Sequence, residues 1–173
     1  MAAKKQWARY AKPVASRPAM PASYGVERKP SAGMVDWGAL GERLASARNY
    51  WVATTRPDGR PHAVPVWGLW LDGAFYFATD RASRKGRNLR ANPALVVHLE
   101  SGDDVVILEG RAEEVSNRAL LARFADAYEA KYQFRPVTGN PAQVVHRLRP
   151  RTALSWREGD FVRSATRWRF GGD

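Results

Sequence analysis

Cysteine is absent from this 173-residue chain, and so are long apolar runs. Without cysteine the chain cannot hold a disulfide scaffold, an iron–sulfur cluster or a zinc ribbon, and it cannot use thiol catalysis. Apolar runs such as 94–97 and 105–108 are far shorter than the ~20 residues that span a membrane. No signal peptide is visible, because charges interrupt the first residues. We therefore expect a soluble, cytoplasmic protein that does not associate with a membrane.

Several catalytic and nucleotide-binding motifs are absent as well. The sequence has no GxGxxG, GxxxxGK[ST], GxSxG or HExxH, and no pair of carboxylates at a meaningful spacing. Its three histidines, His62, His98 and His146, lack the spacing of metal ligands, and a structural role is the simpler interpretation for each. We predict no catalytic residue and no metal site, so enzymatic activity would have to come from a bound cofactor.

Negative charge is scarce. The chain carries 28 Lys and Arg against 17 Asp and Glu, a formal net charge of +11. This imbalance favours an anionic partner, which could be a phosphate, a polyanionic tail, a nucleic acid or a lipid head group. The charge alone does not say which, because many basic side chains only solvate a surface.

The chain divides into two parts of different composition. Residues 1–35 are proline-rich, carry seven Lys and Arg against one Glu, and show no sustained periodicity. They predict a mobile or wrapped arm, which Trp7, Tyr24 and Met34 could pin to the body or to a second subunit. Residues 36–173 form the expected cofactor-binding domain.

Apolar periodicity and turn residues outline that domain. Its pattern predicts a mainly β, α+β fold, a barrel with peripheral helices, because antiparallel strands follow one another without a βαβ rhythm. Turn chemistry at 57–59 and 72–73 connects the first three strands. The expected helices are 37–47 with Asp36 as N-cap, a short helix within 80–91 capped by Asp80 or Ser83, and a helix from Ser116 to about Lys131. The expected strands are 50–55, 61–71, 74–79, 94–100, 105–114, 144–148, 152–156 and 161–170.

The segment Ser83 to Asn88 is the first candidate site. A capped helix N-terminus offers free N–H groups and the positive end of a dipole, and Arg84, Lys85 and Arg87 add full charges. These are the components of a phosphate site. A solvated basic helix is the competing interpretation.

Two further segments are weaker candidates. Pro65 removes a ladder N–H from strand 62–67, so it belongs at a sheet edge or bulge, where main-chain groups can face a flat heterocycle. In the terminal segment 166–170, interleaved Arg and Trp could stack on a ring or pair with phosphate. Trp156 before it is the better candidate for a core position.

Taken in order, these segments resemble the flavin split-barrel family related to pyridoxamine 5'-phosphate oxidase. The resemblance runs from WVATTRPDGRPHAVPVW through SRKGRNL, VVILEGRAEEV and YEAKY to TRWRF, covering roughly residues 36–170. It is closest to the actinobacterial flavin and deazaflavin (coenzyme F-420) oxidoreductases. Pyridoxamine-phosphate oxidases end in an Arg-x-His motif, and TRWRF lacks that histidine, so vitamer oxidation is not expected.

The resemblance implies a six-stranded antiparallel split β-barrel with peripheral helices. It also implies a homodimer with its cofactor sites at the subunit interface. Strand 62–66 would contribute backbone groups at the ring edge, Thr79 would meet the ring or ribityl chain, and Trp168 would come from the other subunit or cover the site. Ser83, Lys85 and Asn88, with Arg87 nearby, would take the phosphate. The implied cofactor-binding residues are His62, Ala63, Val64, Pro65, Val66, Thr79, Ser83, Lys85, Arg87, Asn88 and Trp168.

The resemblance further implies hydride transfer between the bound cofactor and a small organic substrate. Coenzyme F-420 is the favoured cofactor, because the basic segment 81–90 suits its longer polyanionic tail, and FMN is the alternative. A protein that carries the cofactor without turnover would have the same fold and site. A nucleic-acid-binding barrel is a more distant alternative.

Overall fold

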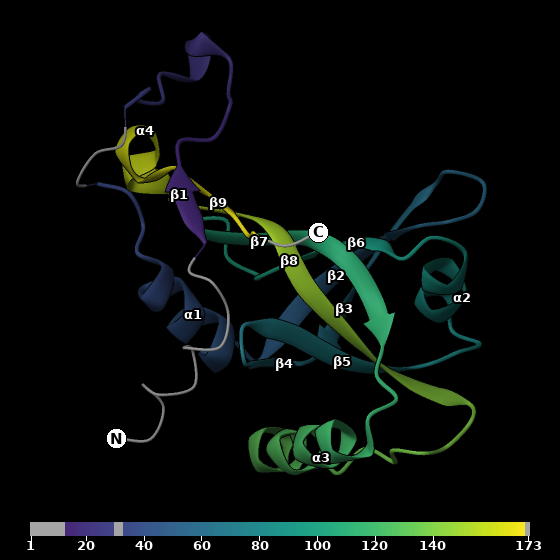
Figure 1. Cartoon of the computed structure of the whole chain (residues 1–173). Coiled ribbons are helices and arrows are strands. Elements are labelled where there is room, and N and C mark those ends of the chain that lie inside the picture. The colour runs from purple at the N-terminus through teal and green to yellow at the C-terminus, as the bar shows by residue number, and fades with distance from the viewer. Residues whose placement is uncertain (1–12, 30–32, 172–173) are drawn as a thin grey trace.

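The computed structural model describes residues 13–29 and 33–171, and these residues form an antiparallel sheet with helices around it (Figure 1). The helices are α1 (Trp37–Ser46), α2 (Arg84–Ala91), α3 (Arg118–Tyr132) and α4 (Phe161–Ser164), with 3-10 turns η2 (Ala22–Tyr24) and η3 (Glu158–Asp160). The strands are β1 (Val14–Ser16), β2 (Asn49–Thr55), β3 (Pro61–Trp67), β4 (Leu69–Leu71), β5 (Ala74–Asp80), β6 (Ala94–His98), β7 (Asp104–Glu114), β8 (Gln143–Arg157) and β9 (Thr166–Arg169). None of the described helices is long and apolar enough to cross a membrane.

The strands are ordered β1-β9-β8-β7-β6-β2-β3, and β5 pairs with β4 and with β8. β8 is the longest strand and organises the sheet. One of its edges pairs with β7, and the other pairs first with β5 and then with β9. Within the described part of the chain no ladder joins β3 to β5, so the sheet curls without closing. The predicted split barrel of mainly β, α+β class is confirmed.

The strand count differs from the expected six, because nine strands form. The expected strand 61–71 breaks at Gly68, where an added Cβ would lie 2.4 Å from the Phe75 ring. Two expected strands, 144–148 and 152–156, merge into β8 through Pro150. A register shift between Glu109 and Gly110 of β7 absorbs that proline, which has no N–H to donate. The expected strand 161–170 begins instead as α4.

Side-chain caps fix the helix starts. Asp36 Oδ2 accepts from the Ala39 amide at 3.1 Å, as the sequence predicts. Of the two possible caps for α2, Ser83 is the one used, and Asp80 instead accepts from the Ala82 amide. The cap of α3 is Asn117, whose Oδ1 accepts from Leu120 at 2.9 Å, so the expected cap at residue 116 is wrong by one position.

The described part of the arm is wrapped onto the body. β1 pairs with β9, and the two strands and α4 lie together at one end of the molecule (Figure 1). Arg17 anchors the segment, because its buried guanidinium donates to the carbonyls of Arg163 and Ala165. Tyr24 packs edge-on against Phe161. Residue 7 lies outside the described residues, and the domain boundary at residue 35 stays a prediction.

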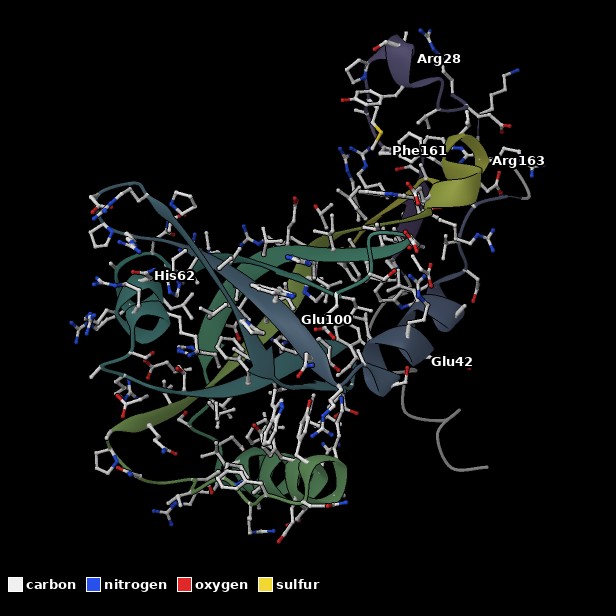
Figure 2. The ribbon with its side chains drawn as sticks, turned by 180° about the vertical axis from the view of Figure 1, so that it is seen from behind. Arg28, Glu42, His62, Glu100, Phe161 and Arg163 are labelled. Atoms are coloured by element: carbon white, nitrogen blue, oxygen red, sulfur yellow. The ribbon has the colours of Figure 1, made fainter. Side chains whose placement is uncertain are left out.

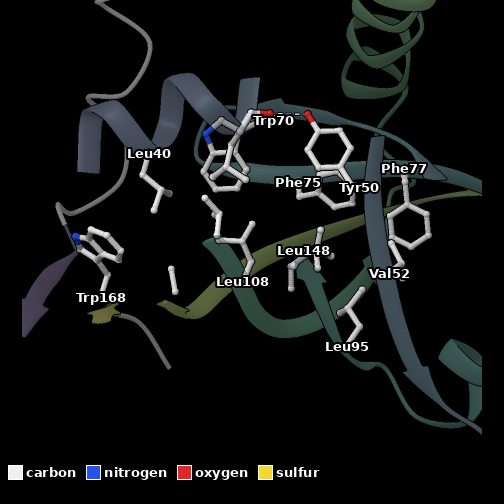
Figure 3. Packing of buried hydrophobic residues seen from close by; sticks show 14 of the residues in the cluster. Leu40, Tyr50, Val52, Trp70, Phe75, Phe77, Leu95, Leu108, Leu148 and Trp168 are labelled. Carbon is white, nitrogen blue, oxygen red and sulfur yellow. Dashed lines mark hydrogen bonds between the residues drawn. The ribbon is translucent and has the colours of Figure 1, made fainter. Parts of the chain in front are cut away.

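The core fills the inside of the curled sheet, where α1 closes one end (Figure 3). A second cluster of buried side chains, around Phe124, Tyr128 and Tyr132, lies between α3 and the β4–β5 hairpin. The first cluster includes Leu89 of α2 as well as Leu40 and Leu44 of α1, so it holds both helices, and the second cluster holds α3. The largest fully buried side chains are Trp168, Tyr50, Phe75, Phe77, Phe124, Leu40 and Leu44.

Candidate functional site

The outer end of the β2–β3 hairpin lies against α2 (Figure 2). Asn88 of α2 donates from Nδ2 to Thr54 Oγ1 of β2 at 2.9 Å, and both side chains are buried. His62 of β3 is the register partner of Thr54. These contacts bring α2 and both strands of the hairpin to one rim of the barrel.

Positive charges collect at this rim. Arg56 follows β2, Arg84 and Lys85 open α2, and all three act on His62. The pKa of His62 is held below its ordinary value, first by burial and then by the charges of Arg56, Lys85 and Arg84. We call Arg56, His62, Arg84 and Lys85 the rim cluster. Since its members repel one another, an anion bound among them would be stabilised.

Several donors of the rim cluster lack partners. Arg56 Nε and His62 Nδ1 are buried and make no hydrogen bond to any described residue. Burial lowers the pKa of Lys85, and no ion pair joins Lys85 to a carboxylate within residues 13–29 and 33–171. A buried polar group without a partner costs about 1–3 kcal/mol. The oxygens of a phosphate are acceptors that would fit Arg56 Nε–H, the Lys85 ammonium and the N–H of His62 in its Nδ1-protonated tautomer.

Hydroxyl groups and a helix N-terminus complete the rim. Ser83 Oγ accepts from the Gly86 amide at 3.1 Å and lies 3.0 Å from Thr79 Oγ1. Gly86 is needed for this packing, because a Cβ there would lie 2.4 Å from the Asp80 carbonyl oxygen. The positive end of the α2 dipole therefore lies beside the rim cluster.

Two expected phosphate ligands on α2 have other contacts. Arg87 is exposed, and its Nη1 donates to the Ala82 carbonyl. Asn88 is fully buried, and its Nδ2 donates to β2, while its Oδ1 has no hydrogen-bond partner among the described residues. Its position on α2 places it on the face that packs against the sheet. Asn88 thus positions α2, and its expected contact with a phosphate stays a prediction.

The residues of β3 alternate in exposure. Ala63 and Pro65 are exposed, whereas His62, Val64 and Val66 are half-buried. β3 ends the strand path, so Pro65 lies in an edge strand as the sequence predicts. Contact of this strand with a cofactor ring stays a prediction.

Trp168 does not reach any site on the surface. It is 1% exposed and lies among the buried side chains of the core (Figure 3). Its ring centroid is 5.5 Å from that of the half-buried Trp37. Strand β9 is paired on both edges, by β8 and β1, and this fixes which side chains point inward. Arg167 and Arg169 take the outer face. The expectation that Trp168 stacks on or covers a cofactor is therefore wrong.

The histidines remain apart from one another. Among the described residues, no group of three or more His, Cys, Asp or Glu could hold a metal ion. His98 Nδ1 lies 2.8 Å from the Leu99 carbonyl, and His146 is buried beside Phe77. Trp156, the expected core residue, is only half-buried and packs edge-on against Phe161.

Arg56 is the rim residue that sequence reasoning missed, and Arg84 was named in the candidate segment but not among the cofactor-binding residues that the resemblance implies. Arg84 stood within the candidate helix, but Arg56 precedes the turn at 57–59, 28 positions earlier. The sequence feature that could have pointed to Arg56 is its position next to the predicted hairpin turn. Only the packing of α2 against β2 shows that the two charges share one rim.

The described residues thus form a split barrel with a cationic rim beside the N-terminus of α2. The sequence pattern of the pyridoxamine 5'-phosphate oxidase family matches residues 38–157, and the chain belongs to this family. The resemblance noted from the sequence is thereby confirmed.

Individual relatives agree with this assignment. A pyridoxine/pyridoxamine 5'-phosphate oxidase of Gluconobacter oxydans is 46% identical over 85 residues, which are 46% of this chain and 38% of that protein. The matched region thus spans less than half of the relative. A conserved hypothetical protein of Mycobacterium tuberculosis, Rv2991, superposes with a TM-score of 0.64 at 29% identity, over 75% of this chain and 90% of that one. A solved F-420 reductase superposes with a TM-score of 0.51 at 26% identity, over 65% and 94%.

Proposed function

We propose that this protein is an oxidoreductase that binds the deazaflavin coenzyme F-420 and transfers hydride between it and a small organic substrate. The observation that carries the proposal is the rim cluster, with its unpaired buried donors beside an edge strand and a helix N-terminus. Such a rim suits the phosphate of a ring-bearing cofactor. When bound, the deazaflavin ring supplies the hydride chemistry that no side chain of this protein offers.

The chain's own residues would bind and orient the cofactor. Arg56, Arg84 and Lys85 would neutralise its phosphate, and Ser83 and Thr79 would offer hydroxyls beside it. The backbone of residues 62–66 in strand β3 would lie along the ring of the cofactor. This set overlaps the expected ligands in Thr79, Ser83, Lys85 and β3. It leaves out Arg87, Asn88 and Trp168 as phosphate or ring ligands and adds Arg56 and Arg84.

Two observations favour the deazaflavin over FMN. One is the likeness to the solved F-420 reductase. The other is charge: the rim cluster continues into the exposed Arg87 and Arg90 of α2, and the chain carries a net +11. A single phosphate does not require so many cations, whereas an acidic tail does. The cytoplasm stays the predicted location, on the cysteine-free composition alone.

The protein would work as a homodimer whose partner completes each site. Support comes from a row of cross-strand neighbours on the outer face of the sheet: Pro65, Trp51, His98, Ile107 and Leu154. Pro65 is exposed and the other four are half-buried. The opposite face of the same strands is the barrel core. This outer row crosses five strands and is mainly apolar, so it is a suitable contact surface for a second copy of the chain.

The test is a fluorescence titration of the purified protein with coenzyme F-420 and, separately, with FMN, at 50 mM and 300 mM salt. Tight, saturable binding of F-420 that weakens with salt is expected, because screening acts on a polyanion bound at a cationic rim. Tighter binding of FMN would make this protein a flavin enzyme instead. Binding of neither cofactor would overturn the proposal.

A further inference from the structure

A second group of aromatic and cationic side chains lies at the end of β3 that is opposite to the rim cluster. Trp67, the last residue of β3, stacks on Tyr132 of α3 with ring centroids 4.8 Å apart and planes inclined by 7°. The guanidinium carbon of Arg48 lies 5.5 Å from the Trp67 ring centre and 5.8 Å from that of Tyr132. We call Arg48, Trp67 and Tyr132 the aromatic stack.

The stack is rigidly mounted. The Tyr132 hydroxyl accepts from the Gly68 amide at 3.0 Å and lies 2.7 Å from the Arg48 carbonyl oxygen, to which it can donate. Lys131 lies beneath the ring, 5.3 Å from its centre, and donates to Tyr50 Oη at 3.0 Å. The backbone at Arg48 and Gly68 and a half-buried lysine therefore fix the plane of the Tyr132 ring, on which the indole of Trp67 rests.

The outer part of the stack is open. Trp67 is 38% exposed, whereas Tyr132 beneath it is buried. Arg48 is exposed, and in the described part of the chain its guanidinium forms no ion pair. An exposed indole of fixed orientation attracts a flat conjugated ring. A guanidinium with free N–H groups beside the edge of that indole attracts an anionic substituent on the bound ring.

The stack and the rim cluster flank the two ends of one strand. β3 has seven residues and spans about 20 Å at ~3.3 Å per residue. A cofactor held by its phosphate at the rim, with its ring along β3, would extend toward Trp67. A molecule lying on the indole would then be next to that ring.

We infer that the aromatic stack is the substrate platform, and that the substrate is a planar conjugated molecule with a carboxylate or similar anionic group. This inference rests on the proposed function. Trp67 holds the ring of the substrate, and Arg48 selects its charge. Both are specificity-determining residues, and neither donates or accepts the hydride.

The test compares 2-naphthoate with neutral 2-naphthamide as probes, by calorimetric titration of the protein with and without bound F-420. Wild type should prefer naphthoate. Trp67→Leu should weaken both probes by about tenfold through the loss of stacking. Arg48→Gln should weaken naphthoate by at least about tenfold and leave naphthamide within about twofold, since a charge-assisted hydrogen bond is lost.

Two variants serve as matched controls. Phe134→Ala removes an exposed aromatic near the stack that does not contact Trp67, and Arg118→Gln removes an exposed arginine at the far end of α3. Both should bind the probes like wild type. Thermal unfolding of each variant shows that it is folded.

The outcomes separate the two proposals. F-420 affinity that stays unchanged in Trp67→Leu, together with weakened probe binding, supports the platform. Probe binding that Trp67→Leu and Arg48→Gln leave unaltered overturns the platform even if F-420 binds. Failure of F-420 to bind, while naphthoate still depends on Trp67, overturns the proposed function and leaves the planar-anion site at the stack.

Discussion

Asn88 of α2 donates to Thr54 of β2, and this buried hydrogen bond ties the helix of the candidate phosphate site to the hairpin that carries Arg56 and His62. The two residues are 34 positions apart in sequence. Because the bond is buried and joins α2 directly to β2, it sets the distance between the charges of α2 and those of the hairpin. Its loss should therefore affect both stability and ligand binding.

Asn88→Ala is expected to lower the free energy of unfolding by about 1–3 kcal/mol, because it leaves the buried Thr54 hydroxyl without its donor. Chemical denaturation measures this change. The double variant Asn88→Ala/Thr54→Val removes both polar partners and should lose less stability than the sum of the losses in Asn88→Ala and Thr54→Val. Strictly additive losses would mean that the two side chains do not interact.

Lys85→Ala is expected to weaken cofactor binding by about 1.5–3 kcal/mol, the range for a hydrogen bond to a charged group. Its half-buried ammonium has no carboxylate partner among the described residues, so the loss should appear in binding and not in stability. Fluorescence titration with F-420 provides the affinity. Arg118→Ala is the control, since this exposed arginine opens α3 and lies outside both the rim cluster and α2. Equal affinities for all three proteins would place the phosphate elsewhere.

Local chemistry explains the parts of the fold that the sequence predicts. The hairpin at Asp72 and Gly73 forms as expected, and both residues have positive φ, 50° and 74°, as a two-residue turn requires. Helix starts follow the capping residues to within one position. Ser116 and Asn117 are adjacent and equally able to cap, so residue types alone could not choose between them.

Pairing between distant segments explains the parts that it does not predict. Trp168 alternates with Arg167 and Arg169, and only the pairing of β9 with β8 and β1 decides that the indole points inward. The rim cluster likewise depends on how α2 packs against β2. The residues 83–88 predicted a candidate phosphate site at α2, whereas the position of Arg56 beside His62 could be found only from the tertiary fold.

His146 should make the protein sensitive to acid. Burial lowers the pKa of this imidazole to about 4, with opposing smaller effects from Glu114 and Arg81, and neither ring nitrogen has a partner among the described residues. Between pH 6.5 and 4 the unfolded chain binds a proton at this histidine and the folded protein does not. The free energy of unfolding should therefore fall as the pH falls through this range.

The measurement is urea denaturation of wild type and His146→Phe at several pH values from 7 to 4. Phenylalanine suits the site because His146 packs against Phe77, with ring centres 5.4 Å apart. The variant should lose less stability on acidification than wild type does. A constant difference between the two proteins at every pH would show that His146 titrates alike in both states.

Ile107→Glu should break the proposed dimer. Ile107 lies in the middle of the outer row, between His98 and Leu154, and its side chain is half-buried in the single chain. An uncompensated charge buried at an interface costs about 3–5 kcal/mol, so the dimer dissociation constant should rise at least about a hundredfold. Sedimentation velocity at a series of protein concentrations measures it. Val162→Glu, an exposed residue of α4 outside the row, should leave the constant unchanged. If wild type sediments as a monomer at every concentration, or if both variants dimerise like wild type, the outer row is not the interface between copies of this chain.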